Sequence, residues 1–434
     1  MDQLKKNTDA DLKNTDADLK NTNADLKNTN ADLKNTDLNT NPALNTNPAL
    51  NTALTAAASA ATFAKAAFAA ANVNPFKTAL YVILAVVIAG TIWYFVSTVS
   101  KKQNGIDSTY VIVNNKIKTL SSNSSGNKDI MTMPLRNFYI KTALNCCCLG
   151  EWKNNYVDMV PLISAIKQGY RCLDFEIFSE DNKPVVSAST KPDFYNKEMY
   201  NSLPLSDVVS TIISNAFSSS LTITPNGGDP LLINLRIKSN NSNVDFVNGI
   251  VKAINQFGDR LLGPDYNYLY DGNNLGQQPI SAFMGKVIIM ADVSNSLCTN
   301  NKSLYQIINV GVTSPFLHLL QYNLGVKNTP DMNTLIDHNK KNMSIVFPDL
   351  PFKENSNFNV AKAFGCQMIG MMPQLKDVNL QLCNKAFDSA GVAFILKPAN
   401  LCYKPVVLEL PPPQDKALSF AGRNYSTDYA SWSV

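Results

Sequence analysis

The sequence lacks the short motifs that mark the most common enzyme classes. It contains no P-loop, no dinucleotide-binding glycine fingerprint, no GxSxG motif and no HExxH motif. Histidine is nearly absent, with 2 in 434 residues. His318 lies in an apolar run that predicts a packed residue of a helix, and His338 lies in a polar stretch, where we expect it to be exposed. These absences leave no local sign of nucleotide binding, serine hydrolase chemistry or zinc protease chemistry.

Paired cysteines are also lacking, since the 8 cysteines include no CxxC. Cys146, Cys147 and Cys148 are adjacent, and neighbouring cysteines do not easily form a disulfide with each other. We therefore expect reduced thiols facing a cytosol-like compartment. A lipidation or metal site is an alternative for the triple cysteine, but buried thiols are the simpler interpretation.

The net charge of +4 is small and spread along the chain. A nucleic-acid-binding protein usually concentrates basic residues on one face or stripe, so no nucleic-acid partner is expected. The length of 434 residues is enough for one large domain with appended segments.

Residues 1–52 are low-complexity repeats with Leu12, Leu19, Leu26 and Leu33 seven residues apart. A period of seven is typical of coiled coils, but the repeat is rich in Asn, Thr and Asp, which are poor helix formers. Pro42 and Pro48 would end any helix. We predict a disordered or weakly structured tether, with a repeat that orders only against a protein partner as the alternative.

Two apolar segments follow the repeats. Residues 53–77 are rich in Ala and predict a helix, with an interfacial membrane helix as the alternative. Residues 78–99 carry no charge. As a helix they would extend ~33 Å, enough to cross a bilayer core of about 30 Å. The sequence therefore predicts a single transmembrane helix, followed by a polar linker at 100–129.

The lysines around this segment predict an orientation. Lys65 and Lys77 precede the apolar span, whereas Lys101, Lys102, Lys116 and Lys118 follow it. Cytoplasmic flanks carry the excess of basic residues, so we expect a single-pass membrane protein whose C-terminal domain faces the cytosol. The unpaired cysteines agree with that orientation.

The segment 364–401 carries the most specific pattern of the chain. Two apolar runs flank an amphipathic stretch, which predicts a strand, a helix or extended turn, and a second strand. The residue pattern resembles the Y region of eukaryotic phosphoinositide-specific phospholipase C, in which GCQM is followed at a distance by LKPxxL. The matching positions are Gly365, Cys366, Gln367, Met368, Asp377, Asn384, Phe387, Gly391, Phe394, Leu396, Lys397, Pro398 and Leu401.

An X region that resembles the same family precedes it. PLRNFYIKTALN begins at Pro134, GYRCLDFEIF at Gly169, KPVVSAST at Lys183, and PLLINLR at Pro230. The resemblance covers about residues 130–404 and leaves 405–434 as a C-terminal tail. It implies an α/β fold, a distorted (β/α)8 TIM barrel of the phospholipase C type. The apolar runs by themselves also suggest a parallel sheet.

The resemblance also implies where the catalytic groups of the family should lie. The first family histidine position is Leu144 and the second is Thr190. A general acid or base contributes about 10²–10⁴-fold to the rate, and neither Leu nor Thr can serve as one at neutral pH. We therefore expect no catalytic residue at these positions.

The calcium site implied by the family is only partly present. Asn145, Asp174 and Glu176 are oxygen ligands of the right type, but Arg236 takes the fourth ligand position. A guanidinium about 4 Å from Ca²⁺ would be repelled by roughly 8 kcal/mol at an effective dielectric of 20. We expect no cofactor, or calcium if the degenerate site still binds. We hypothesise that Arg236 replaces the ion and pairs with Asp174 or Glu176.

Basic residues that would bind a phosphorylated inositol are missing as well, because the family positions hold Met290, Asp292 and Ile345. We predict a membrane-anchored, catalytically inactive phospholipase C-like protein with a structural or interaction role. Low-complexity, Asn-rich repeats fused to a degenerate, host-like enzyme suit a large DNA virus or a protist, and the first of these implies a virion membrane. An active calcium-dependent hydrolase with a rebuilt site is one alternative. The other is a non-catalytic lipid-binding module, which calls for a basic barrel opening that the sequence does not supply.

Overall fold

A computed structural model describes residues 75–109, 116–123, 128–191, 196–217, 224, 226–239, 242–267, 274–350, 353–405 and 421–434. The repeats predicted at 1–52 and most of the Ala-rich segment at 53–77 lie outside these residues. The chain divides into two compact units, Met1–Tyr110 and Val111–Val434.

The described part of the first unit, residues 75–109, is a long helix, α3 (Pro75–Thr109). Within it, Ala79–Ser108 has a mean hydropathy of 2.3 over an 18-residue window and is long and apolar enough to cross a membrane. The helix continues past the predicted end at 99, and Gln103 donates to Asp107 at 3.0 Å one turn later. Residues 100–109 of the predicted linker are therefore helical.

The second unit is built on a parallel sheet that is nearly closed into a barrel. In the described residues its strands follow the order β7-β6-β5-β2-β1-β10-β9-β8, and every neighbouring pair is parallel. The two end strands, β7 and β8, lie beside each other. The bounds are β1 (Phe138–Ala143), β2 (Cys172–Glu180), β5 (Leu231–Ile237), β6 (Val287–Asp292), β7 (Val310–Val312), β8 (Leu317–Gln321), β9 (Met343–Phe347) and β10 (Met368–Met371).

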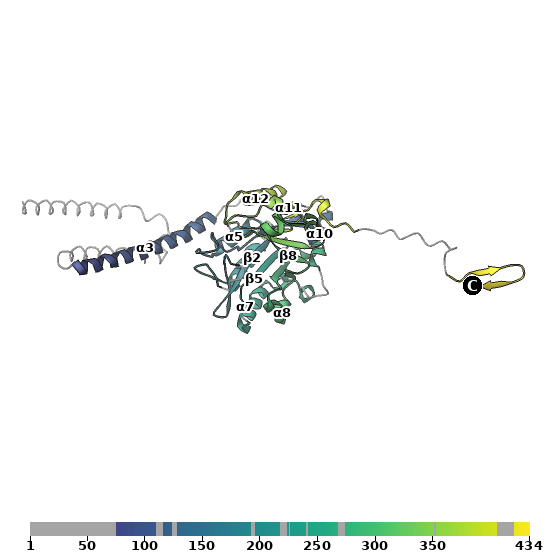
Figure 1. The fold of residues 1–434 in the computed structure, drawn as a ribbon, viewed down its shortest axis with the longest axis horizontal. Coiled ribbons are helices and arrows are strands. Elements are labelled where there is room, and N and C mark those ends of the chain that lie inside the picture. The colour runs from purple at the N-terminus through teal and green to yellow at the C-terminus, as the bar shows by residue number, and fades with distance from the viewer. Residues whose placement is uncertain are drawn as a thin grey trace, which may run out of the picture. The chain divides into compact units, whose positions relative to one another are not determined.

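Helices pack around these strands, as Figure 1 shows for α5, α7, α8, α10, α11 and α12. Several begin at an Asn or Asp that accepts from the first-turn amides, for example Asp158 for α5 and Asp377 for α12. The α-helices are α4 (Leu120–Asn123), α5 (Met159–Lys167), α6 (Leu205–Ala216), α7 (Val244–Ile254), α8 (Ser296–Asn300), α9 (Lys302–Tyr305), α10 (Met332–Lys341), α11 (Phe358–Ala363) and α12 (Val378–Ala390).

Shorter elements complete the unit. Three strands lie off the main path: β3 (Lys183–Ser187), β4 (Leu203–Pro204) and β11 (Phe394–Leu396), which pairs antiparallel with β1. A separate hairpin joins β12 (Asn424–Ser426) to β13 (Ser431–Ser433). The short helical turns are η1 (Lys128–Thr132), η2 (Leu135–Asn137), η3 (Asn255–Arg260), η4 (Pro264–Tyr266), η5 (Leu275–Gln277), η6 (Ile280–Phe283), η7 (Tyr322–Lys327) and η8 (Ala399–Leu401).

The segment 364–401 folds as its sequence predicts. β10 is followed by α12 and then by β11. Leu380, Cys383 and Phe387 are the buried side of α12, whereas Val378 is 67% exposed. Gly391 ends the helix in the left-handed conformation with φ 68°.

The polar linker predicted at 100–129 differs from the structure near its end. Ile117 and Leu120 are buried in the core of the second unit. The Lys118 amide donates to the Gly391 carbonyl at 2.9 Å, and the Leu120 amide donates to Asp229 at 2.8 Å. Ile117 and Leu120, with these backbone hydrogen bonds, attach the segment to the second unit, so this part of the chain belongs to the barrel.

The helix predicted around His318 is wrong. Residues Leu317–Gln321 form β8, which pairs with β9 in the register Leu317↔Met343 to Gln321↔Phe347. The run is short and mostly apolar, and periodicity alone does not separate a strand from a buried helix in so short a segment.

Candidate functional site

The predicted site residues gather where the carboxyl ends of the strands meet, an end called the barrel mouth here. Asn145 lies just beyond β1, with φ 42°, a left-handed conformation that Asn tolerates better than most residues. Asp174 and Glu176 project from β2, and Arg236 lies near the end of β5. The parallel register sets Glu176 beside Arg236 and Asp174 beside Asn234. Alternate residues of both strands therefore share one face.

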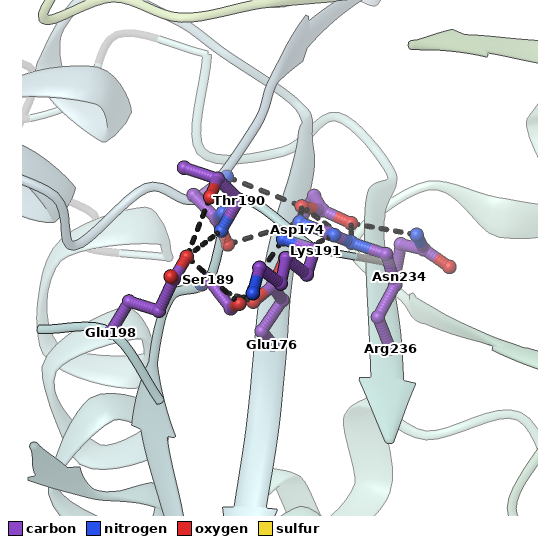
Figure 2. A network of polar contacts seen from close by, with 9 residues as sticks. Asp174, Glu176, Ser189, Thr190, Lys191, Glu198, Asn234 and Arg236 are labelled. Atoms are coloured by element: carbon purple, nitrogen blue, oxygen red, sulfur yellow. Dashed lines mark hydrogen bonds and ion pairs between the residues drawn. The ribbon is translucent and has the colours of Figure 1, made fainter. Parts of the chain in front are cut away.

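Arg236 binds all three predicted oxygen-bearing residues. Its Nε donates to Asp174 Oδ1 at 2.9 Å, and one of its two terminal nitrogens, Nη2, donates to Asp174 Oδ2 at 2.6 Å. Nη2 also donates to Asn145 Oδ1 at 3.0 Å, and the other terminal nitrogen, Nη1, forms an ion pair with Glu176. Figure 2 shows Arg236 reaching Asp174 from the neighbouring strand. The hypothesised pairing is present, with both carboxylates.

The two carboxylates have further donors. Asp174 is 0% exposed and accepts from the Asn234 side chain at 2.7 Å and from the Asn145 amide at 3.2 Å. Glu176 is 1% exposed and accepts from the Ser189 amide at 2.8 Å. Buried charges need such partners, because an unpaired carboxylate is costly to remove from water.

The electrostatics follow from burial and pairing. Burial raises the pKa of Glu176, although Arg236 and Lys238 oppose that shift. Burial by itself would lower the pKa of Arg236, but its attraction to Asp174 and Glu176 is stronger and raises that pKa above the usual value. Arg236 therefore remains charged throughout the physiological range.

Aromatic rings enclose the guanidinium on its other sides. The Arg236 Cζ atom lies 5.0 Å from the centroid of the Phe347 ring and 5.7 Å from that of Trp152. Such cation–π contacts strengthen when the cation is shielded from water. Neither ring was predicted as part of the site, because each comes from a part of the sequence remote from Arg236.

Leu144, at the first family histidine position, is a buried packing residue and provides no ionisable group. It is 0% exposed and packs over Gly370 of β10. A Cβ atom at Gly370 would lie 2.6 Å from Leu144 Cδ1, so the glycine provides the room for this leucine. The position is filled by packing.

Thr190, at the second family histidine position, is held by an acidic side chain. Its hydroxyl donates to Glu198 Oε2 at 2.6 Å, and its amide donates to the same oxygen at 2.8 Å. Figure 2 shows Glu198 beside Thr190 and Ser189. Hydrogen bonds from Thr190 and Lys153 outweigh burial and lower the pKa of Glu198 to about 2, so this carboxylate is a weak base.

The two histidines stack on each other. Their ring centroids lie 3.6 Å apart with an angle of 12° between the planes. His318 alternates on β8 with Leu319 and Gln321, which line the cavity at the barrel mouth, so its ring points to the opposite side of the strand. His338 lies on α10 and is half-buried, so the predicted exposure is wrong. Burial lowers the pKa of both rings.

A cavity of about 500 Å³ opens beside Arg236. Lys191 and Lys238 line it, as do Glu176 and Asp292. The two lysines were missed by the sequence reasoning. Lys238 could have been found, because it follows Arg236 by two residues, just past the end of β5, and side chains two apart in an extended chain point the same way. The cavity carries both signs of charge.

This geometry agrees with the comparisons with known proteins. Residues 131–292 match the X domain of phosphatidylinositol-specific phospholipase C. The chain carries an X domain of the phospholipase C family. No curated protein matches the sequence of the chain.

The solved structures similar to this phospholipase C-type chain include S. officinalis PLC21, with 16% sequence identity and a TM-score of 0.50. The match covers 62% of this chain and 37% of that one, so it spans well under half of S. officinalis PLC21. L. pealei PLC21 matches with 17% identity and a TM-score of 0.48, covering 62% and 38%. A calcium-dependent phosphoinositol-specific phospholipase C from Pseudomonas sp matches with 10% identity and a TM-score of 0.42, covering 62% and 97%. At these identities the likeness of S. officinalis PLC21 shows the fold alone.

The calcium ion that the family implies does not fit the residues present. Ca²⁺ takes six to eight oxygen ligands. Here the oxygens of Asn145, Asp174 and Glu176 already surround the guanidinium of Arg236. No group of three His, Cys, Asp or Glu side chains that could hold a metal ion occurs within the described residues.

Proposed function

We propose that the protein is a membrane-anchored, non-catalytic phospholipase C-like barrel with a structural or interaction role. One observation carries the proposal: the two family histidine positions hold side chains that cannot move a proton at neutral pH. Leu144 is packed over Gly370, and Thr190 is bound by Glu198. General acid–base catalysis needs an ionisable group within reach of the reacting oxygen.

Membrane anchoring is supported by α3, whose apolar stretch Ala79–Ser108 has the length to span a bilayer. Cys402 is half-buried, the other cysteines are buried, and all eight are free, which suits a barrel in the cytosol. The repeats at 1–52 would then display a binding segment for a protein partner on the opposite side, in a virion or cellular membrane.

The test is hydrolysis of phosphatidylinositol and its bisphosphate by the full chain in detergent micelles, with calcium or with chelator. We expect no inositol phosphate release in either condition, and none from a Leu144→His/Thr190→His double variant, because Arg236 still occupies the metal position. Calcium-dependent turnover by the wild-type chain would overturn the proposal. Loss of that turnover in Asp292→Asn or Lys238→Met would then locate a rebuilt acid–base pair.

A second candidate function is non-catalytic binding of an anionic lipid headgroup in the cavity. Lys191 and Lys238 line the cavity and provide two cations that the sequence analysis did not assign to it. Calorimetry with a short-chain phosphatidylinositol bisphosphate should then show binding that Lys191→Glu and Lys238→Glu each weaken. Equal affinity in the wild type and both variants would exclude this function.

A further inference from the structure

We propose that Arg236 is a built-in cation that makes the barrel mouth independent of dissociable metal. In this view the guanidinium alone keeps Asn145, Asp174 and Glu176 from forming a divalent-cation site. The inference concerns the metal dependence of the fold and stands whether or not the barrel is an enzyme.

The oxygens of three side chains converge on the guanidinium of Arg236. The two Asp174 oxygens and the Asn145 side-chain oxygen lie 2.6–3.0 Å from nitrogens of one guanidinium, and Glu176 forms the remaining ion pair. Three side chains, two from strand β2 and one from the loop after β1, therefore direct oxygens at one small volume. Carboxylate and amide oxygens around one point are the ligand set that Ca²⁺ prefers.

Two of the three side chains are buried carboxylates, so this volume needs a positive charge. Asp174 and Glu176 are 0% and 1% exposed, so water cannot compensate for them. A positive charge at this point is required for the fold, and Arg236 supplies it from within the chain, at 13% side-chain exposure. Such a charge cannot dissociate, whereas a metal ion can.

The guanidinium of Arg236 excludes a divalent cation from this volume. Arg236 and Ca²⁺ cannot share this volume, since repulsion at about 4 Å in an effective dielectric of 20 corresponds to roughly 10⁵–10⁶-fold in affinity. Wild-type protein should therefore bind no calcium at the barrel mouth. Replacing the guanidinium by a carboxylate should create a site of three carboxylates and one amide, completed by water.

Trp152 provides a local probe of this site. Its ring lies 5.7 Å from the Arg236 Cζ atom. Tb³⁺ takes the same oxygen ligands as Ca²⁺ and emits when a nearby indole is excited. Emission that disappears in Trp152→Phe therefore reports an ion at the barrel mouth and separates it from ions bound elsewhere.

The experiment compares the full chain in detergent with Arg236→Glu, measuring Tb³⁺ emission and the Tm with calcium or chelator. The wild type should show no Trp152-dependent emission and no shift of Tm. Arg236→Glu should have a lowered Tm in chelator, regain about 5 °C or more in calcium, and show emission that Trp152→Phe removes. Arg236→Lys keeps the cation and should gain neither response.

Arg260→Glu is the matched control for reversing a charge on the same unit. Arg260 donates to the Gly285 carbonyl at 3.2 Å and lies 4.3 Å from the Phe217 ring centroid, with no ion pair to a carboxylate among the described contacts. This variant should gain no metal response. Arg236→Gln supplies a second substitution with an amide oxygen in case Arg236→Glu does not fold.

Two results would overturn the inference. One is Trp152-dependent emission or a calcium-dependent Tm in the wild type, which would mean that Arg236 does not exclude metal. The other is the absence of a calcium response in both Arg236→Glu and Arg236→Gln, including the case in which neither folds in calcium, since a metal then cannot replace the guanidinium.

Discussion

Lys397 is a buried lysine whose charge is only weakly compensated. It is 3% exposed, and its ammonium donates to the Asn339 carbonyl at 2.8 Å. Burial lowers its pKa to about 7, while the thiols of Cys366 and Cys402 act in the opposite direction. A lysine that loses its proton so near neutral pH makes the stability of the barrel depend on pH.

The sign of that dependence follows from proton binding. Between the folded pKa of about 7 and the unfolded value of about 10.4, the unfolded chain binds the extra proton, so stability rises with pH. The test window ends near pH 8.5, because unfolded thiols then begin to titrate in the opposite direction. Urea unfolding of the full chain should show the wild type gaining at most about 1.4 kcal/mol per pH unit relative to Lys397→Met. Parallel pH profiles for the two proteins would contradict this.

At the scale of elements, strand register explains which contacts were predictable. Asp174, Glu176 and Arg236 lie at alternate positions of two strands with clear apolar patterns, so their meeting follows from a parallel sheet. Packing between remote elements carries no such signal. The fit of Leu144 over Gly370 depends on a missing Cβ, and neither residue looks unusual in the sequence.

The stacked histidines illustrate the same limit. His318 lies on β8 and His338 on α10, and the two elements are joined by a π-helical turn, η7, and a loop that no local pattern predicts. The short apolar run around His318 predicts a helix, whereas these residues form strand β8. The strand places its ring over His338.

The stack predicts an acid-sensitive contact. Burial lowers the pKa of both rings, and the charge of His318 lowers that of His338 further. As pH falls below 6.5, the two histidines therefore take up protons in the unfolded chain before they do so in the folded one. Stability should therefore fall from pH 6.5 towards pH 5. His338→Phe keeps a stacking ring and removes one titrating group, so its loss in that interval should be smaller, as measured by urea unfolding.

The same variant has an internal control at neutral pH. His338 Nε2 lies 3.2 Å from the Met343 carbonyl oxygen, and losing that contact should cost about 1 kcal/mol at every pH. A uniform offset with an unchanged acid response would show that the pair does not titrate as inferred.

At the scale of the whole molecule, the chain combines one apolar helix with one barrel unit. Val86 and Val87 lie within Ala79–Ser108 and are 66% and 55% exposed in the isolated helix. Exposed valines within the uncharged stretch 78–99 of this helix suit a lipid environment. The apolar span of this helix was readable from the sequence, because it requires no tertiary contact, whereas its continuation from 100 to 109 was not predicted.

Membrane insertion should be sensitive to charge only in the middle of that helix. Replacing Val86 and Val87 by Arg costs about 2.5–3.5 kcal/mol each on an insertion scale, so the double variant should be released by alkaline carbonate while the wild type stays in the pellet. Ser100→Arg with Gln103→Arg, at the polar end, is the matched control and should behave as wild type. Release of the wild type would argue against a spanning helix.

The pairing of β1 with β10 bears on the order of events during synthesis. Ile140 pairs with Met368, so the first strand of the barrel has no partner on that side until nearly the whole chain has left the ribosome. At 5–20 residues per second that delay is on the order of tens of seconds. α3 precedes β1 and is complete long before. A nascent chain would therefore engage the bilayer first and hold an open, thiol-bearing half-barrel in reach of chaperones until its last strands arrive.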